Sequence, residues 1–274
     1  MNDDDGDAPL HRRASTSAFG SQIVADIVMG LAFYSRIPMP ANAHEPPELN
    51  RIAMALPFTS LAIGAAPALL LVLLAELGLP GIFAAGIAVS VLMILTGAMA
   101  EDGLADAADG LFGGATTTRR LEIMRDHTHG TYGIVALVMF LLLRVVAIGA
   151  IAAISPLAAA GAWLAAMVLS RSGSLWLAVV LPPARTDGLS AAVGGVTRRA
   201  FLLGAVFAVI FALLLAGSLG GPGALVAILA VTAACAWGGM QLAKHLLGGQ
   251  TGDVIGALQA LIELAVLAVL LGFA

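Results

Sequence analysis

The chain has 274 residues and a mean hydropathy of +0.99; 60% of its residues are hydrophobic and only 11% are charged. A soluble domain carries about 25% charged residues, so this composition excludes an ordinary soluble globule, a disordered protein and a nucleic-acid-binding surface. It predicts an all-α, polytopic transmembrane helical bundle in a lipid bilayer. The net charge of −4 includes four aspartates near the start. They predict a disordered acidic tail over residues 1–18, and we expect residues 19–274 to form a single transmembrane domain.

About seven apolar windows are long enough to cross a bilayer, which takes about 20 residues. The segment before them, residues 19–37, is shorter and contains Asp26, so we expect an interfacial or re-entrant helix there. The seven windows cover residues 52–74, 82–100, 131–154, 157–181, 201–218, 223–242 and 254–273.

Lysine and arginine residues occur only in alternate connections between these windows. The connections at residues 75–81, 155–156 and 219–222 contain neither residue type. The positive-inside rule then places every basic loop and the N-terminus in the cytoplasm, and the C-terminus outside. Most of the acids and histidines lie in the same basic loops. We therefore expect an active site that faces the cytoplasm.

Residues 101–110 form the most informative polar segment, with four acids and two glycines. The segment directly follows the second window, so we expect it to extend that helix. At about 100° per residue, Asp102, Asp106 and Asp109 share one face. Such carboxylates repel one another unless a cation neutralises them, and clusters of oxygen ligands suit Mg²⁺ or Mn²⁺. The alternative is a solvated helix end, although such surfaces usually mix both signs of charge.

A basic segment with two histidines follows at residues 119–133. Arg119, Arg120 and Arg125 could bind phosphates through their planar guanidinium groups, or could anchor the loop on the cytoplasmic side. His127 and His129 lie two residues apart, which is poor spacing for metal ligands on a helix. We expect both histidines to be polar loop residues.

Two arginines lie inside apolar windows, where a charge costs about 2.5–3.5 kcal/mol and faces a partner or a wet cavity. We expect Arg144 to form a structural ion pair, with Glu263 as a candidate counter-charge, and Arg171 to face a cavity as a phosphate ligand. Asp253 opens the last window. It is either an N-cap, a role that Thr251 could also fill, or a fourth carboxylate of the site.

The polar motifs together resemble the cobalamin synthase family, the adenosylcobinamide-GDP ribazoletransferases. The resemblance extends in family order over about residues 30–265, so it covers nearly the whole chain. It rests on the segments at residues 33–38, 96–110, 120–126, 130–133, 184–189 and 249–257.

This resemblance implies a Mg²⁺-dependent phosphotransferase of the bacterial inner membrane. The enzyme would join adenosylcobinamide-GDP to α-ribazole, or to α-ribazole 5′-phosphate, and release GMP in the late stage of vitamin B12 synthesis. The implied metal ligands are Asp102, Asp106 and Asp109, with Glu101 as a further ligand. The implied catalytic residues are Asp126, as a base for the attacking hydroxyl, and Arg125. The implied phosphate ligands are Arg120, Arg171 and Arg185.

Two other functions stay open as alternatives. A CDP-alcohol-type phosphotransferase acting on a lipid would carry a D-G-x-x-A-R motif, but the Ala-Arg pair is absent after Asp102 and Gly103. A cation-coupled transporter often has internal repeats, and the acidic segment has no counterpart in the second half of the chain. The sequence leaves the oligomeric state open, including a homo-oligomer.

Overall fold

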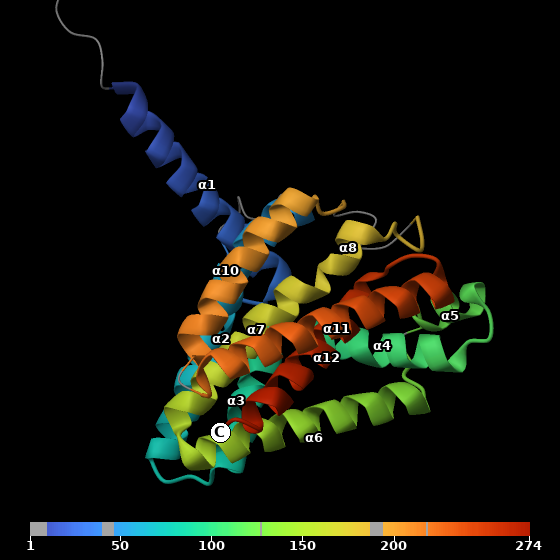
Figure 1. Ribbon diagram of the computed structural model, residues 1–274. Helices are drawn as coiled ribbons and strands as arrows, with labels where there is room; N and C mark the ends of the chain where they lie inside the picture. The colour runs from blue at the N-terminus through green and yellow to red at the C-terminus, as the bar shows by residue number, and fades with distance from the viewer. Residues whose placement is uncertain (1–9, 40–46, 127, 187–193, 218) are drawn as a thin grey trace, which may run out of the picture.

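The computed structural model describes residues 10–39, 47–126, 128–186, 194–217 and 219–274, and this part of the chain is an all-α bundle (Figure 1). The predicted fold class is confirmed. The described helices are α1 (Leu10–Tyr34), α2 (Leu49–Glu76), α3 (Gly81–Thr96), α4 (Met99–Gly113), α5 (Thr117–Ile123), α6 (Thr131–Ile154), α7 (Pro156–Ser174), α8 (Trp176–Val180), α10 (Arg198–Ala216), α11 (Gly221–Leu247) and α12 (Gly252–Leu271).

Six helical segments are long and apolar enough to cross a membrane: α2, α6, α7 together with α8, α10, α11 and α12. They match six of the seven predicted windows. The remaining window, residues 82–100, corresponds to α3, which has only 16 residues. At 1.5 Å per residue α3 is about 24 Å long, less than the hydrocarbon thickness of about 30 Å.

A sharp break separates α3 from the acidic helix α4. Gly97 and Ala98 both adopt left-handed backbone conformations, with φ of 64° and 55°, and the two helix axes differ by 87°. The side chain of Arg36 fills the space beside Gly97, where a Cβ atom would overlap it. The prediction that residues 101–110 extend the second window is therefore wrong, because two consecutive left-handed residues end the helix. The pair α3–α4 counts as at most one broken span.

The N-terminal segment differs in part from the expected arrangement. Helix α1 begins at Leu10, inside the predicted tail, while residues 1–9 and 40–46 lie outside the described part. Its apolar portion, Gln22–Tyr34, is too short to span, as expected for residues 19–37. Asp26 is buried in this portion of α1. Its carboxylate oxygen accepts hydrogen bonds from the Arg51 guanidinium group of α2, with nitrogen–oxygen distances of 2.7–2.8 Å. The division into a tail and one catalytic domain stays a prediction.

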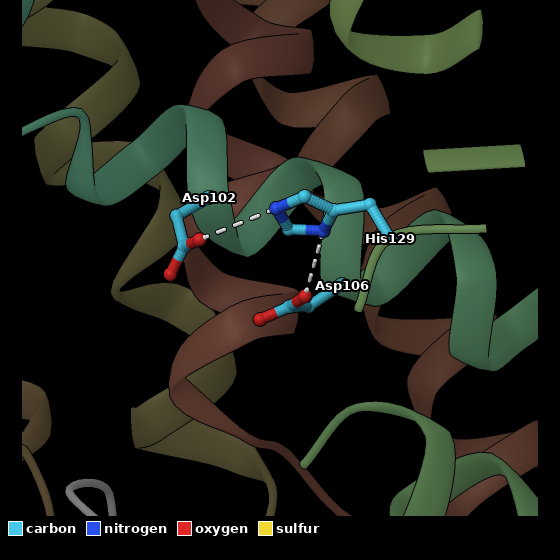
Figure 2. Close-up of side chains that lie close together, drawn as sticks. All are labelled: Asp102, Asp106 and His129. Atoms are coloured by element: carbon cyan, nitrogen blue, oxygen red, sulfur yellow. Dashed lines mark ion pairs between the residues drawn. The ribbon is translucent and has the colours of Figure 1, made fainter. Parts of the chain in front are cut away.

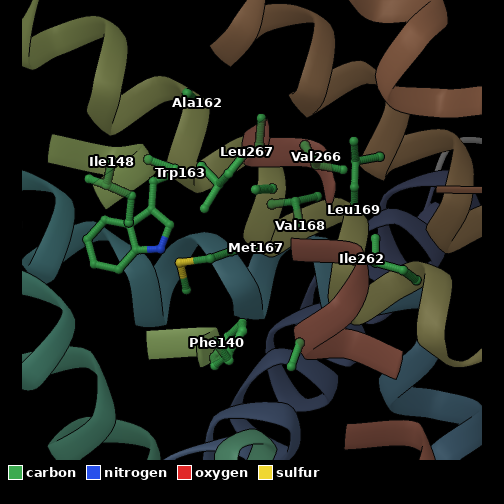
Figure 3. Close-up of a cluster of buried hydrophobic side chains, with 14 of the residues drawn as sticks. Phe140, Ile148, Ala162, Trp163, Met167, Val168, Leu169, Ile262, Val266 and Leu267 are labelled. Atoms are coloured by element: carbon green, nitrogen blue, oxygen red, sulfur yellow. The ribbon is translucent and has the colours of Figure 1, made fainter. Parts of the chain in front are cut away.

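Helix α7 lies at the centre of the bundle and packs against α2, α10 and α12. Figure 3 shows the apolar core around α7, with Trp163, Met167 and Val168 beside Val266 and Leu267 of α12. Helix α10 contributes small residues at every fourth position, a spacing that lets helices approach closely in membranes. The buried residues of α10 are Ala200, Gly204, Ala208, Ala212 and Ala216.

Candidate active site

Helix α4 is held between α12 and α6, and this packing positions its acids. The contact with α12 depends on Gly103, where an added Cβ atom would lie 3.0 Å from the carbonyl oxygen and 3.2 Å from the Cα atom of Asp253. Neither is a flexible side-chain atom, so a larger residue would push the helices apart. Glycine at this position therefore brings Asp253 close to the acidic face of α4.

Two of the predicted metal ligands, Asp102 and Asp106, lie beside the imidazole of His129. Figure 2 shows the ring of His129 beside Asp102 and Asp106. The His129 Nδ1 atom lies 3.4 Å from Asp106 Oδ1, and His129 Nε2 lies 3.9 Å from Asp102 Oδ1. One candidate ligand atom from each residue lies within 4.8 Å of the other two. We call this group the Asp102–Asp106–His129 cluster.

Sequence reasoning missed His129 as a site residue. It expected His129 to be a polar loop residue, and His129 does precede α6 in a loop, but this loop also brings the imidazole beside the acids of α4. His127 lies outside the described residues. The available signal was the pair Gly130 and Gly133 directly after His129, since paired glycines often mark a close backbone approach.

Asp109 shares the helix face of the cluster but contacts different groups. Its carboxylate accepts hydrogen bonds from the main-chain N–H groups of Gly130, at 2.6 Å, and Gly133, at 2.9 Å. Both amides belong to the N-terminal end of α6, where main-chain donors lack helical partners. The structure therefore does not bring the predicted ligand Asp109 into the cluster.

Glu101 also has protein partners rather than a place in the cluster. It accepts a hydrogen bond from Arg144 at 2.9 Å, and the other terminal nitrogen of Arg144 lies 2.7 Å from Glu263. Trp163 donates its indole N–H to Glu263 at 3.0 Å. The predicted ion pair between Arg144 and Glu263 is confirmed, and the structure adds Glu101 as a second carboxylate. The role of Glu101 as a metal ligand stays a prediction without support from this geometry.

At the start of α12 the two candidate caps have separate roles. Thr251 is the N-cap, with its hydroxyl accepting from the Val254 N–H at 3.2 Å. The Asp253 carboxylate instead lies 3.0 Å from a terminal nitrogen of Arg185. Asp253 and Asp102 line the same cavity, and the role of Asp253 as a further carboxylate of the site stays a prediction.

A cavity of about 230 Å³ opens beside the cluster, and Asp102 belongs to both. Arg171 and Arg185 both line it, as expected for phosphate ligands. Within the described part of the chain, two buried guanidinium nitrogens of each arginine have no hydrogen-bond partner. Arg171 also lies over the ring of Tyr34, 6.0 Å from its centroid. The remaining polar lining residues are Thr96, Glu101, Arg144, Asp253, Gln259 and Glu263.

The other predicted site residues lie away from this cavity. Arg120 donates to the carbonyl oxygens of Leu111 and Leu246, so it ties α5 to α4 and α11. Arg125 and Asp126 are exposed in the loop between α5 and α6, and neither lines the cavity. Their predicted roles gain no support from the geometry.

The charges around the cluster favour a bound cation. Asp106 lies outside the six spanning helical segments, and its pKa is raised to about 6, first by burial and then by the neighbouring carboxylates of Asp102 and Asp253. A divalent cation would relieve this repulsion. Two carboxylates and one imidazole are a donor set that several divalent metals accept. The arrangement can thus hold a metal beside a cavity lined by two arginines, which suits a phosphorylated ligand.

Comparison with known proteins gives consistent matches. A family model described as cobalamin-5-phosphate synthase matches residues 26–271. An adenosylcobinamide-GDP ribazoletransferase of Azorhizobium caulinodans is 47% identical over 251 residues, covering 90% of this chain and 95% of the relative. Relatives of the same name from Xanthobacter autotrophicus and a Sinorhizobium species are 43% and 42% identical, over 92% and 89% of this chain and 96% and 95% of their own. No solved structure matches the chain significantly.

Proposed function

From the chain's membership of the cobalamin-5-phosphate synthase family, we propose that it acts as an adenosylcobinamide-GDP ribazoletransferase. In this reaction a ribose hydroxyl that is free in both α-ribazole and α-ribazole 5′-phosphate, and is therefore not the 5′-hydroxyl, attacks the cobinamide-side phosphorus of the diphosphate. A new P–O bond forms, the P–O bond to the departing phosphate breaks, GMP leaves, and the hydroxyl proton is released. Such a step needs charge neutralisation and alignment more than covalent catalysis.

The observation that carries the proposal is that carboxylates and arginines with unpartnered nitrogens line one cavity. Asp102, which belongs to the Asp102–Asp106–His129 cluster, and Asp253 line the cavity, as do Arg171 and Arg185. Among the residues that the structure describes, two buried guanidinium nitrogens of each arginine have no hydrogen-bond partner. Burying such donors is unfavourable unless they find an acceptor. The non-bridging oxygens of a diphosphate would satisfy them.

We further propose Mg²⁺ as the cofactor, held by Asp102 and Asp106 with Asp253 close by. When bound, the cation would neutralise charge on the diphosphate as the P–O bond to GMP breaks. Arg171 would orient the diphosphate from inside the bundle. Arg185 is held in place by Asp253 and would bind the same group from the α12 side.

The proposed location is the bacterial inner membrane, with the cavity open to the cytoplasm. The cavity lining includes Arg185, which lies in one of the basic connections, and Asp253 at the start of α12, which supports this orientation. A phosphorylated nucleotide substrate would then reach the cavity from the aqueous side.

The test is a turnover assay on the full chain in lipid nanodiscs, with adenosylcobinamide-GDP, Mg²⁺ and either acceptor. GMP release and cobalamin formation are measured together. Asp106→Asn should abolish turnover, and Arg171→Ala should lower kcat by about 10²–10³-fold, as for loss of a charge-stabilising donor. Arg119→Ala is the matched control, because Arg119 is exposed and, within the described part of the chain, its ion pair is with Glu122 on its own helix. Wild-type protein that releases no GMP with either acceptor would refute the proposal.

A further inference from the structure

The loop that carries His129 is anchored to α4 by a buried carboxylate. Asp109 is 6% exposed, and each of its two oxygens accepts a main-chain N–H at the start of α6. The anchor needs glycine at both positions. A Cβ atom at Gly130 would lie 2.6 Å from Asp109 Oδ1, and one at Gly133 would overlap Oδ2. The contact therefore fixes the distance between α4 and the first turn of α6.

This anchor determines where His129 lies. His129 immediately precedes Gly130, so the Asp109 hydrogen bonds hold its backbone over α4. Asp106 lies almost one turn before Asp109 on that helix and Asp102 lies one turn before Asp106. The imidazole consequently reaches both carboxylates, at 3.4 Å from Asp106 and 3.9 Å from Asp102.

We propose that His129 supplies a nitrogen ligand to the cation bound by Asp102 and Asp106, and that Asp109 is a positioning residue that holds His129 in place rather than a ligand. The proposal rests on the metal of the proposed function. It divides the three aspartates of one helix face into two ligands and one anchor. Asp109 is absent from the group of ligand atoms that lie within 4.8 Å of one another among the described residues.

A nitrogen ligand has a consequence for metal preference. Carboxylate and water oxygens suit both Mg²⁺ and Mn²⁺, but the hard Mg²⁺ ion accepts an imidazole nitrogen less readily than a first-row transition ion such as Mn²⁺ does. The site should therefore favour Mn²⁺ over Mg²⁺ more strongly than a site of carboxylates alone. Removing the imidazole should weaken Mn²⁺ binding more than Mg²⁺ binding.

The first test uses Mn²⁺ as the probe on the full chain in nanodiscs. Pulsed electron paramagnetic resonance should detect ¹⁴N coupling to bound Mn²⁺ in the wild type, and His129→Ala should remove it. The same variant should lower Mn²⁺ affinity by about tenfold or more, measured by titration. His245→Ala is the matched control, because His245 is also exposed but lies on α11 and does not belong to the Asp102–Asp106–His129 cluster. Wild-type protein without bound Mn²⁺ or without ¹⁴N coupling overturns the proposal, as does coupling that persists in His129→Ala.

The second test separates an anchor from a ligand. If Asp109 positions His129, Asp109→Ala should weaken the ¹⁴N coupling and speed hydrogen exchange at Gly130 and Gly133. If Asp109 were a ligand, the variant would weaken Mn²⁺ binding while the remaining bound ion kept its ¹⁴N coupling, and the proposal would fail. Asp109→Asn, which retains one acceptor oxygen, provides the same comparison if Asp109→Ala does not fold.

The turnover assay keeps the two proposals distinguishable. GMP release without ¹⁴N coupling rejects the role of His129 and leaves the proposed function in place. Conversely, ¹⁴N coupling without GMP release supports the role of His129 and rejects the proposed function.

Discussion

Arg144 and Arg171 are both buried in spanning helices, at 2% and 4% exposure, but their surroundings differ. Arg144 contacts the carboxylates of Glu101 and Glu263 and lies near the ring faces of Phe140 and Trp163. Arg171 keeps two nitrogens without a hydrogen-bond partner within the described part of the chain. At the residue scale, Arg144 thus has a structural role, and Arg171 remains free to bind a ligand.

The residue-scale prediction concerns Arg144. Arg144→Ala leaves two buried carboxylates without their cation, and breaking a buried ion pair on one side costs about 3–5 kcal/mol. We expect a corresponding fall in the free energy of unfolding, measured by denaturant titration of the protein in detergent micelles. Arg119→Ala, which removes an exposed arginine paired with the exposed Glu122, should leave stability within experimental error. Equal stability of both variants would contradict a structural role for Arg144.

At the element scale, the break between α3 and α4 and the close contact between α4 and α12 place the acidic helix. The break turns α4 by 87° from α3, so its acids do not continue along the axis of the preceding apolar helix. Gly103 then allows α12 to approach until Asp253 and Asp102 line the same cavity. The geometry of the site is thus set by the relation of α4 to two helices distant in the sequence.

The prediction for this contact is that Gly103→Ala will lower kcat/KM while the protein remains folded in the membrane. The added methyl group meets backbone atoms of Asp253 at 3.0–3.2 Å, so the helices must shift by a few tenths of an ångström. Since a misplacement of about 1 Å can cost 10²-fold in rate, we expect a loss of about tenfold in the GMP assay. Gly113→Ala on the same helix is the control, because its Cβ atom would lie 3.8 Å from Ile123 in ordinary contact. An equal loss of kcat/KM in Gly103→Ala and Gly113→Ala would contradict the claim that activity depends on the spacing between α4 and α12.

These elements also show what the sequence can predict. The spanning helices follow from local composition, since about 20 apolar residues suffice to define each one. The break at Gly97 and Ala98 does not, because it involves Arg36, which contacts Gly97 from a distant part of the chain. In the site, helical periodicity placed three aspartates on one face, but the different partners of Asp106 and Asp109 come from the loop before α6 and from its first turn. Arg144 could be paired with Glu263 in advance, since a buried charge requires a partner and Glu263 lies in another apolar window.

At the scale of the whole molecule, the two ends of the bundle differ in chemistry. The cluster, the cavity and the basic connections lie at one end. The opposite end contains small apolar contacts, such as Gly81 against Gly149 and Gly220 against Phe273. In Figure 1 the C-terminus lies far from α5, in agreement with this division.

The whole-molecule prediction is the orientation of these ends in the membrane. In a Cys235→Ala background, Glu76→Cys should react with a membrane-impermeant maleimide in intact bacterial cells made permeable only at the outer membrane. Arg119→Cys should react only after the cells are lysed, because the proposed orientation places α5 in the cytoplasm. Labelling of Arg119→Cys before lysis would contradict the proposed orientation and would place α5 outside the cytoplasm.

The buried ion network also imposes an order on biogenesis. Arg144 and Glu101 are synthesised long before Glu263, which lies in the last helix of the chain. Helix insertion and helix association are separable stages in membranes. The Glu263 carboxylate that pairs with Arg144, the Arg185 partner Asp253 and one wall of the cavity all belong to α12. The helices that are inserted earlier therefore have an incomplete charge network, and the candidate site is complete only when α12 packs against them.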